Sequence, residues 1–512
     1  MQKHEIDQAS VIGALAWPLF GGYLGHKVFR WTGGYLQLSD REPWIAVGVI
    51  IGLGAAVFFA WFLRNFADDG FRGARYKRWL RGSKMENWHG LRSRVDSSNS
   101  KFNKEERKCG RGAVSPIMIG KMPMPLYMED RHTLLCATTG AGKSTVLEHM
   151  ISSAFFRRDK MVIVDPNGTF FSKFGLSGDT ILNPFDTRSV GWSVFNEIHG
   201  DYDFDRMAKS IIPPQISPED EQWCSYTRDL LSDTMRQLAR HGNRRQVDLI
   251  DMLIRQDTDT LRTFLENSDS QGYFRDNADR AIASVQFMIN KYVRPLRLLE
   301  QVGNTSFSLH DWLHNPEPGN LYISWREDMR SAQRPLVATW IDTICATILS
   351  YEPMGLNRFW LFLDELESLG RLESFVPAAT KGRKHGLRIV GTIQDWSQLD
   401  ETYGKDAAKT LLACFRNYVI LAASNALNAD RASEILGKMQ VERLSVSKNT
   451  GKGSSTTRNI IQCPPEPCVL DSEISNLKDL EAYVMFGADY PISKCTIPYF
   501  SRPVRHPAIS VR

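Results

Sequence analysis

A loop of small residues from Thr138 to Thr145 has the composition of a phosphate-binding segment. It lies in the stretch "HTLLCATTGAGKST", after a short apolar run and before apolar residues that recur at helical spacing. Backbone N–H groups at the start of such a helix point toward a bound anion. The pattern therefore predicts a strand at 133–136, then a P-loop, then a helix. The predicted nucleotide ligands are Thr138, Thr139, Gly140, Ala141, Gly142, Lys143, Ser144 and Thr145.

Two side chains of this loop have separate roles in nucleotide chemistry. Lys143 is placed to reach the β- and γ-phosphate oxygens as a catalytic residue, and the hydroxyl of Ser144 is a ligand for Mg²⁺. Ala137 stands where the pattern usually has its first glycine, and its methyl group is tolerable if the φ angle there is negative. We therefore expect ATP and Mg²⁺ as cofactors.

A pair of acidic residues could complete the binding of the metal ion and activate the water that attacks the phosphate. In "RFWLFLDELESLG", the apolar run from Phe359 to Leu363 predicts a buried strand that delivers Asp364 and Glu365 at its carboxyl end. Asp364 is expected to hold the metal, and Glu365 to orient the attacking water as the catalytic base. Alone, an apolar run before Asp-Glu is more often the start of a capped helix. Together with the P-loop, it predicts an ATPase.

A basic segment at residues 380–399, "TKGRKHGLRIVGTIQDWSQL", adds two candidate catalytic residues. Gln394 ends a predicted strand and is a candidate sensor of the γ-phosphate. Arg383 is a candidate to reach the nucleotide of a neighbouring subunit and to stabilise transition-state charge there. The simpler alternatives are a capped strand end and an exposed basic face, and the sequence alone favours the exposed face for the individual basic residues.

Further buried-strand patterns predict one large α/β domain with a doubly wound, mostly parallel sheet. The interval after the strand at 180–183 is too long for a crossover and is rich in helix formers and charges. It predicts an inserted all-α domain at 195–305, so the nucleotide-binding domain comprises 85–194 and 306–512. A polar, basic stretch at 447–458 predicts a flexible loop. The other predicted strands are 161–165, 180–183, 321–325, 387–394, 418–424 and 482–487.

The N-terminal part of the chain has the pattern of a two-helix transmembrane hairpin. Residues 43–63 carry no charge and are long enough to cross a hydrocarbon core as a helix. Residues 9–29 are apolar but interrupted by proline and glycine, and a signal peptide is the alternative there. The basic segment 64–84 places the remaining chain in the cytoplasm by the positive-inside rule. We therefore expect residues 1–8 to be cytosolic and 30–42 to form a short periplasmic loop.

Charge and cysteine content limit the classes of partner and compartment. The formal net charge is +5, and the excess of basic residues in 64–84 accounts for it. The remaining chain is close to neutral, which disfavours a protein that coats nucleic acid with a uniformly basic surface. Eight cysteines are scattered with no C-x-x-C pair, so we expect reduced thiols in a cytosolic body.

Several longer motifs resemble one protein family. The chain is similar to the coupling proteins of type IV secretion, the conjugative TraD/TraG group with its TrwB-type members, within the wider family of ring-shaped DNA pumps that includes FtsK and HerA. The resemblance runs from the N-terminal apolar segments almost to the C-terminus. The motifs that carry it are "TTGAGKS", "MVIVDPNG" at 161–168, "GWSVFNEI" at 191–198, "ISWREDM" at 323–329, "LFLDELESL" at 361–369, "TKGRKHGLRIV" at 380–390 with Gln394, and "VERLSVSKNTGK" at 441–452.

The resemblance implies a membrane-anchored ring ATPase of the bacterial inner membrane. Its subunits are expected to be RecA-like, to form a homo-hexamer, and to carry the all-α domain on the cytoplasmic side. The implied partners are single-stranded and also double-stranded DNA, the relaxase and other relaxosome proteins, and inner-membrane components of the secretion system. By motif position, Arg383 is the arginine acting in trans and Gln394 the phosphate sensor.

The implied activity is ATP-driven pumping of single-stranded DNA, stimulated by DNA. A neutral body suits this activity if a few basic residues from six copies converge on a central pore, because the summed phosphate contacts then determine DNA affinity. Two alternatives remain open. One is a membrane-tethered docking platform whose ATP binding drives assembly, and the other is an ATPase that secretes protein without DNA.

Overall fold

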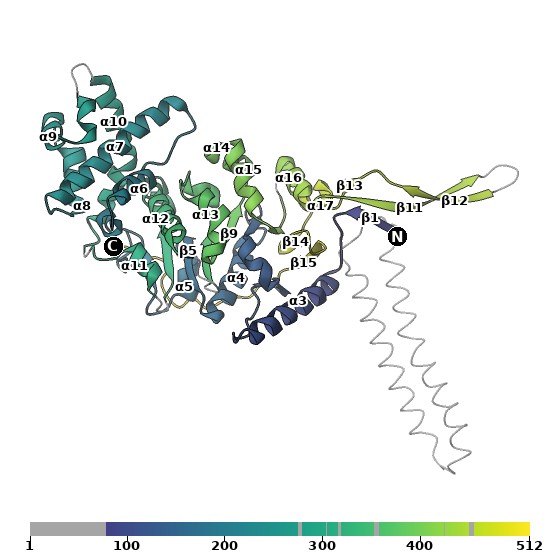
Figure 1. Cartoon of the computed structure of the whole chain (residues 1–512). Helices are drawn as coiled ribbons and strands as arrows, with labels where there is room; N and C mark the ends of the chain where they lie inside the picture. The colour runs from purple at the N-terminus through teal and green to yellow at the C-terminus, as the bar shows by residue number, and fades with distance from the viewer. Residues whose placement is uncertain are drawn as a thin grey trace, which may run out of the picture. The chain divides into compact units, whose positions relative to one another are not determined.

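The computed structural model describes residues 78–274, 279–303, 305–315, 319–352, 358–423, 425–449 and 455–512 (Figure 1). All described residues belong to one compact unit, Tyr76–Arg512. The predicted spans at 9–29 and 43–63, with the loop between them, lie outside the described residues. Within the described ranges, no helix is both long enough and apolar enough to cross a bilayer.

A nine-stranded sheet forms the centre of the larger unit, in the order β15-β14-β10-β4-β9-β8-β5-β7-β6. The seven strands from β10 to β6 run parallel, while β14 and β15 add an antiparallel edge. The prediction of a mostly parallel sheet is confirmed, and the complete sheet is mixed. The strands are β4 (Thr133–Cys136), β5 (Lys160–Pro166), β6 (Thr180–Leu182), β7 (Leu321–Trp325), β8 (Phe359–Leu363), β9 (Leu387–Ile393), β10 (Asn417–Ile420), β14 (Glu481–Phe486) and β15 (Ser493–Thr496).

Both faces of this sheet are covered, because successive residues of a strand point to opposite faces and both sets are buried. In β5, Met161 and Ile163 join the core cluster shared with the helix after the P-loop, while Val162 and Val164 are equally buried on the other face. On the first face lie α3 (Trp88–Lys108), α4 (Lys143–Arg157) and α5 (Thr169–Phe174). The other helices of the body include α12 (Arg330–Ser350), α13 (Phe375–Lys381), α14 (Trp396–Tyr403) and α15 (Lys405–Cys414) (Figure 1).

Between β6 and β7 the chain leaves the sheet and forms a helical region. The described residues from Val194 to Leu299 contain helices and turns and no strand. Amphipathic packing holds them together, with α7 in contact with both α6 and α10. The helices are η2 (Val194–Glu197), α6 (Tyr202–Ile211), α7 (Pro218–Arg240), α8 (Gln246–Ile250), η3 (Asp251–Arg255), α9 (Thr258–Phe264), η4 (Asp269–Phe274), α10 (Asp279–Tyr292) and η5 (Arg294–Leu299), followed by α11 (Leu309–His314).

A second sheet contains a long hairpin that the sequence did not predict. The loop expected at 447–458 is wrong for the residues described there, because β11 (Lys438–Asn449) pairs antiparallel with β12 (Ser455–Gln462) through its last residue. Backbone hydrogen bonds form such a ribbon with polar side chains as well as apolar ones, so the hydrophobic pattern gave no signal. The partners of β11 on its other side are β1 (Arg78–Gly82), from the basic segment 64–84, and β13 (Glu466–Pro467).

The remaining elements are short or peripheral. A two-stranded ladder and a turn of 3-10 helix precede β4, and two helices flank the hairpin. They are β2 (Met118–Ile119), β3 (Met122–Pro123), η1 (Leu126–Arg131), η6 (Glu327–Met329), η7 (Leu366–Leu369), η8 (Gly382–His385), α16 (Ala426–Leu436) and α17 (Asp471–Ser475).

Candidate functional site at the carboxyl edge of the sheet

The loop between β4 and α4 has the conformation of an anion-binding turn. Gly140 and Gly142 both have left-handed backbones, with φ of 83° and 107°. A side chain at Gly142 would be strained by this φ, and its Cβ would lie 2.5 Å from a methyl carbon of Leu480, which would have to move. Within the described part of the chain, no protein acceptor faces the N–H groups of Gly142, Lys143 or Ser144. These unpaired donors at the start of a helix of 15 residues are available to a ligand.

Ala137 fits the loop without strain. It does not belong to the described residues with positive φ, so the condition set for its methyl group is met. Its N–H donates to the carbonyl of Ile393 at 3.2 Å, and the next N–H, of Thr138, donates to Ala422 at 2.9 Å. The loop is therefore fastened to β9 and to the segment after β10 before it turns.

Lys143 lies against the two acidic residues that end β8. Its Nζ is 3.3 Å from Asp364 Oδ1 and 4.0 Å from Glu365 Oε1. The lysine and Asp364 side chains are 11% and 13% exposed and Glu365 is 28% exposed, so the group is accessible from one side. The structure thus brings together the loop lysine and the acidic pair, as the sequence predicted from two distant motifs.

Thr392 is a member of this group that the sequence analysis missed. Its hydroxyl donates to Asp364 Oδ1 at 2.9 Å and accepts from the backbone N–H of Glu365, also at 2.9 Å. Glu365 has a left-handed backbone, with φ of 59° and ψ of 63°, which is costly for a residue with a side chain. The bond from Thr392 helps hold this conformation. A threonine near the carboxyl end of the strand "LRIVGTI", after the apolar residues Ile389 and Val390, was the available signal.

Gln394 connects the loop to the acidic pair. Its amide oxygen accepts from the Thr139 hydroxyl at 3.1 Å, and its Nε2 donates to Glu365 Oε1 at 3.4 Å. Its backbone N–H donates to Glu367 at 2.9 Å. Burial raises the pKa of Glu367, and the positive charge of Lys143 opposes that rise. Glu367 was also missed, and it fixes the position of the strand end that carries Gln394.

Arg330, at the start of α12, adds a second cation near the acidic pair. Its Nη1 is 4.0 Å from Glu365 Oε2 and 2.8 Å from Glu327 Oε1. Arg330 directly follows the motif "ISWREDM" at 323–329, and no pattern in the sequence predicted a role for it. With Lys143 near one carboxylate oxygen and Arg330 near the other, Glu365 lies between two positive charges.

Asp165, at the end of β5, has a structural role beside this group. Both of its oxygens accept backbone N–H groups, from Phe170 at 2.9 Å and Phe171 at 2.7 Å, which anchors α5. Burial raises the pKa of Asp165 to about 7, and the charge of Asp364 on the adjacent strand adds to that rise.

Arg383 does not join the other predicted residues within the chain. It lies in η8 just before β9 begins, and its Nε is 2.8 Å from Asp130, which lies just before β4. It is therefore at the amino edge of the parallel strands, whereas the P-loop is at their carboxyl edge. Its side chain is 55% exposed.

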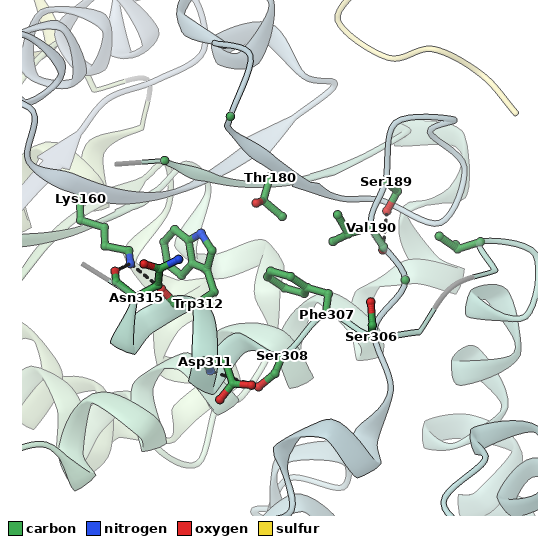
Figure 2. Close-up of a pocket in the computed structure, with 14 residues that line it drawn as sticks. Lys160, Thr180, Ser189, Val190, Ser306, Phe307, Ser308, Asp311, Trp312 and Asn315 are labelled. Atoms are coloured by element: carbon green, nitrogen blue, oxygen red, sulfur yellow. Dashed lines mark hydrogen bonds between the residues drawn. The ribbon is translucent and has the colours of Figure 1, made fainter. Parts of the chain in front are cut away.

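A cavity of about 670 Å³ lies away from this site, beside the starts of β5, β6 and β7 (Figure 2). Lys160 lies at one side of it and donates to the carbonyls of Trp312, Leu313 and Asn315. Burial lowers the pKa of Lys160 to about 8. Because these acceptors end α11, the lysine caps that helix and is not free to bind phosphate.

The comparisons with known proteins agree with this geometry. Residues 116–498 match the family model described as the type IV secretion-system coupling protein DNA-binding domain. This chain belongs to the type IV secretion coupling proteins. This coupling protein is 38% identical to plasmid coupling protein TrwB, solved in complex with ADP and Mg²⁺, with a TM-score of 0.76 over 86% of this chain and 100% of that one. A TrwB structure with the ATP analogue ADPNP gives the same identity and TM-score, over 86% and 99%.

A curated relative adds a second comparison. The chain is 28% identical over 403 residues to the coupling protein TraD of Escherichia coli (strain K12). That alignment covers 77% of this chain and 56% of TraD, so the chain spans about half the length of this relative. The predicted resemblance to TraD and to TrwB-type coupling proteins is confirmed.

Proposed function

We propose that this coupling protein is an ATPase whose hydrolysis drives single-stranded DNA into a conjugative type IV secretion channel. The observation that carries the proposal is the linked group of Lys143, Asp364, Glu365, Thr392 and Gln394 at the carboxyl edge of the sheet. Hydrolysis of a γ-phosphoryl group needs positioned charges and a positioned water more than covalent chemistry. This group contains the side chains for both tasks.

The residues fit ATP with Mg²⁺. The free N–H donors from Gly142 to Ser144 match phosphate oxygens, and related TrwB structures were solved in complex with ADP and Mg²⁺ and with ADPNP. When bound, Mg²⁺ supplies charge neutralisation on the phosphates. Ser144 and Asp364 would hold it, and Lys143 would leave its pairing with Asp364 to contact the phosphate oxygens. Thr138 to Thr145 would line the nucleotide.

Glu365 is the residue we assign to the attacking water. Its carboxylate accepts from Gln394, and Gln394 in turn accepts from Thr139 in the loop. A change at the loop is thereby communicated to the base through two hydrogen bonds. We assign Gln394 to sensing the γ-phosphate on this ground.

The remaining parts of the proposal concern assembly and location. We propose a homo-hexamer of RecA-like subunits in which Arg383 acts on the neighbouring nucleotide, which its exposed position at the opposite edge of the sheet permits. The segment 9–63 would anchor the chain in the bacterial inner membrane, with 85–194 and 306–512 forming the nucleotide-binding domain and 195–305 an all-α domain. The partners would be the relaxosome with its relaxase, the secretion components of the inner membrane, and DNA bound without sequence preference.

The variant Lys143→Thr tests this function. Removing the lysine should abolish both ATP hydrolysis in purified full-length protein and plasmid transfer in mating assays. Hydrolysis by the wild-type chain should rise on addition of single-stranded DNA. Transfer at the wild-type level by the variant would favour the docking platform. An unstimulated rate at every protein concentration would favour secretion of protein without DNA.

A further inference from the structure

The helical region joins the sheet through two connections, and one buried carboxylate ties them together. The incoming connection contains η2, and the outgoing one contains α11. Glu197 of η2 is fully buried and accepts the backbone N–H groups of Leu309 at 2.6 Å and His310 at 3.0 Å. It also accepts from the indole of Trp192 at 2.8 Å. The two connections are therefore held side by side.

Three histidine rings lie next to one another beside this carboxylate, with neighbouring rings tilted by 40° and 35°. The ring of His199, from the incoming connection, lies 4.1 Å from the ring of His310, and His310 lies 4.2 Å from His314, measured between ring centroids. His310 and His314 are four residues apart on α11 and so lie on one face of that helix. The three rings therefore bring several imidazole nitrogens, which are common metal ligands, close together at one surface.

A carboxylate completes the group. One ligand atom each from His199, His310 and Asp311 lie within 4.8 Å of one another. His310 Nδ1 and Asp311 Oδ1 are 3.3 Å apart. Around a tetrahedral ion with bonds of about 2.0–2.1 Å, neighbouring ligand atoms are about 3.3 Å apart, so a small shift of the exposed His199 closes the set.

We propose that His199, His310 and Asp311 form a binding site for a divalent transition-metal ion, of which Zn²⁺ is the best match. Two imidazoles and one carboxylate suit Zn²⁺ better than Mg²⁺, which prefers oxygen ligands alone. Water would complete the coordination, because three protein ligands leave a tetrahedral position open.

The surroundings support an ion at this place. The buried charge of Glu197 lies next to the group and attracts a cation. His314 donates through Nδ1 to the backbone carbonyl of His310 at 2.8 Å, which holds the ring of His314 beside the ring of His310. Asp311 lies at the edge of the cavity of Figure 2, beside Ser308, and both it and His199 are exposed, so an ion can reach them from solvent.

The consequence would be a metal clasp at the base of the helical region. An ion bound by His199 on one connection and by His310 and Asp311 on the other adds to the link through Glu197. An ion that binds only the folded chain stabilises that state. At a free ion concentration of 100 times the Kd, the ratio of folded to unfolded chain rises about a hundredfold.

Equilibrium binding of Zn²⁺ to the full-length chain, with excess Mg²⁺ and ADP to occupy the nucleotide site, tests the proposal. We expect one equivalent of Zn²⁺ and a higher melting temperature. His310→Gln and His199→Gln should each weaken binding by at least about tenfold, the lower end of the loss seen when support for a metal site is removed. His241→Gln, at a histidine bonded only within its own helix end, is the matched control and should bind as wild type.

Substitution with Co²⁺ separates this site from the cysteines. Visible ligand-field bands without a thiolate charge-transfer band are expected, and they should be lost in His310→Gln. A thiolate band that Cys109→Ser removes would assign the binding to that exposed cysteine and overturn the proposal. Equal Zn²⁺ affinity in wild type, His199→Gln and His310→Gln would also overturn the proposal, because the histidine rings would then be neighbours without binding a metal.

Discussion

Two groups of charged side chains lie at opposite edges of the central sheet, and they differ in how completely their charges are paired. At the amino edge, the fully buried Glu129 faces Arg157 at 2.7 Å, Arg358 at 3.6 Å and Arg388 at 3.9 Å. At the carboxyl edge, Lys143 faces Asp364 and Glu365 at 3.3 Å and 4.0 Å, and all three are partly exposed.

The difference separates structure from function. In the amino-edge group, Arg157 donates to both oxygens of Glu129, at 2.7 and 3.1 Å. The arginines are nearly buried, and a ligand has no access to the fully buried carboxylate. The carboxyl-edge pairs have no such two-bond contact and are open to solvent, so a phosphate can displace Asp364 from Lys143 at small cost. Substitutions should therefore change stability at one edge and turnover at the other.

Arg383→Ala should give the largest effect, and it tests the exception to this division. Arg383 lies at the amino edge but is exposed, and its pairing with Asp130 is worth little to stability. We expect turnover to fall by about a thousandfold, the scale of a lost arginine finger, with nucleotide binding and melting temperature retained. Steady-state hydrolysis, nucleotide titration and thermal unfolding measure the three quantities. Lys384→Ala, at the adjacent exposed residue, is the control; equal effects of both variants would show a general charge effect.

Glu129→Gln should mainly lower stability. Glu129 is the carboxylate that faces all three nearly buried arginines, and Arg157 has a second one, Asp159, at 2.5 Å. Removing the Glu129 carboxylate takes this partner from Arg358 and Arg388 and leaves Arg157 with Asp159, which costs about 3 kcal/mol in the free energy of unfolding. Denaturant titration measures the loss, and turnover per folded molecule should be unchanged. Glu105→Gln removes an exposed pair with Lys108 at a similar distance of 2.8 Å and should change stability by less than about 0.5 kcal/mol. An equal loss of unfolding free energy in Glu129→Gln and Glu105→Gln would show that burial does not make the amino-edge charges more important for stability.

The sequence was sufficient for the parts of this site that obey strong local rules. The P-loop and the Asp-Glu pair each follow a buried strand, and the topology of parallel sheets brings such strand ends to one edge. Thr392 and Glu367 could not be predicted as site residues because their roles depend on which strands are neighbours. The order of β8 and β9 is a tertiary property, and a threonine in a strand or a glutamate after one has no pattern of its own.

Outside the site, the apolar strands were found and the polar ones were not. Seven of the predicted buried strands, such as the one at 321–325, form at or near their predicted positions because both faces are covered. β10 stops at Ile420, earlier than predicted, because the chain there turns to accept the P-loop. The hairpin of β11 and β12 was taken for a loop because its residues at 447–449 and 455–458 lack the apolar alternation that marks a half-buried strand.

A smaller effect should appear in the pH dependence of stability, through His132 at the amino edge. Burial lowers the pKa of His132 to about 4, and the neutral ring bonds both Ala379 and Ile389. The unfolded chain, with a histidine pKa of about 6.5, binds more protons between those values, so stability falls as pH is lowered from about 6.5 to 4. The contribution is at most about 3 kcal/mol. The free energy of unfolding should be measured against pH for wild type and for His132→Asn, and the difference between the two profiles gives the contribution of His132. Parallel profiles would contradict the prediction.

Thr392→Val should give the smallest change, and it asks whether the carboxyl edge depends on the angle at which Glu365 is held. Valine keeps the shape of the side chain but removes the hydroxyl that bonds Asp364 and the N–H of Glu365. The loss of this support to a left-handed backbone is worth about 1.4 kcal/mol in the barrier, so turnover should fall about tenfold while nucleotide affinity changes little. Thr392→Ser keeps the hydroxyl and should restore most of the rate. If Thr392→Ser and Thr392→Val reduced turnover equally, packing of the methyl group and not the hydroxyl would govern this position. Packing would then matter at the carboxyl edge as it does at the buried amino edge.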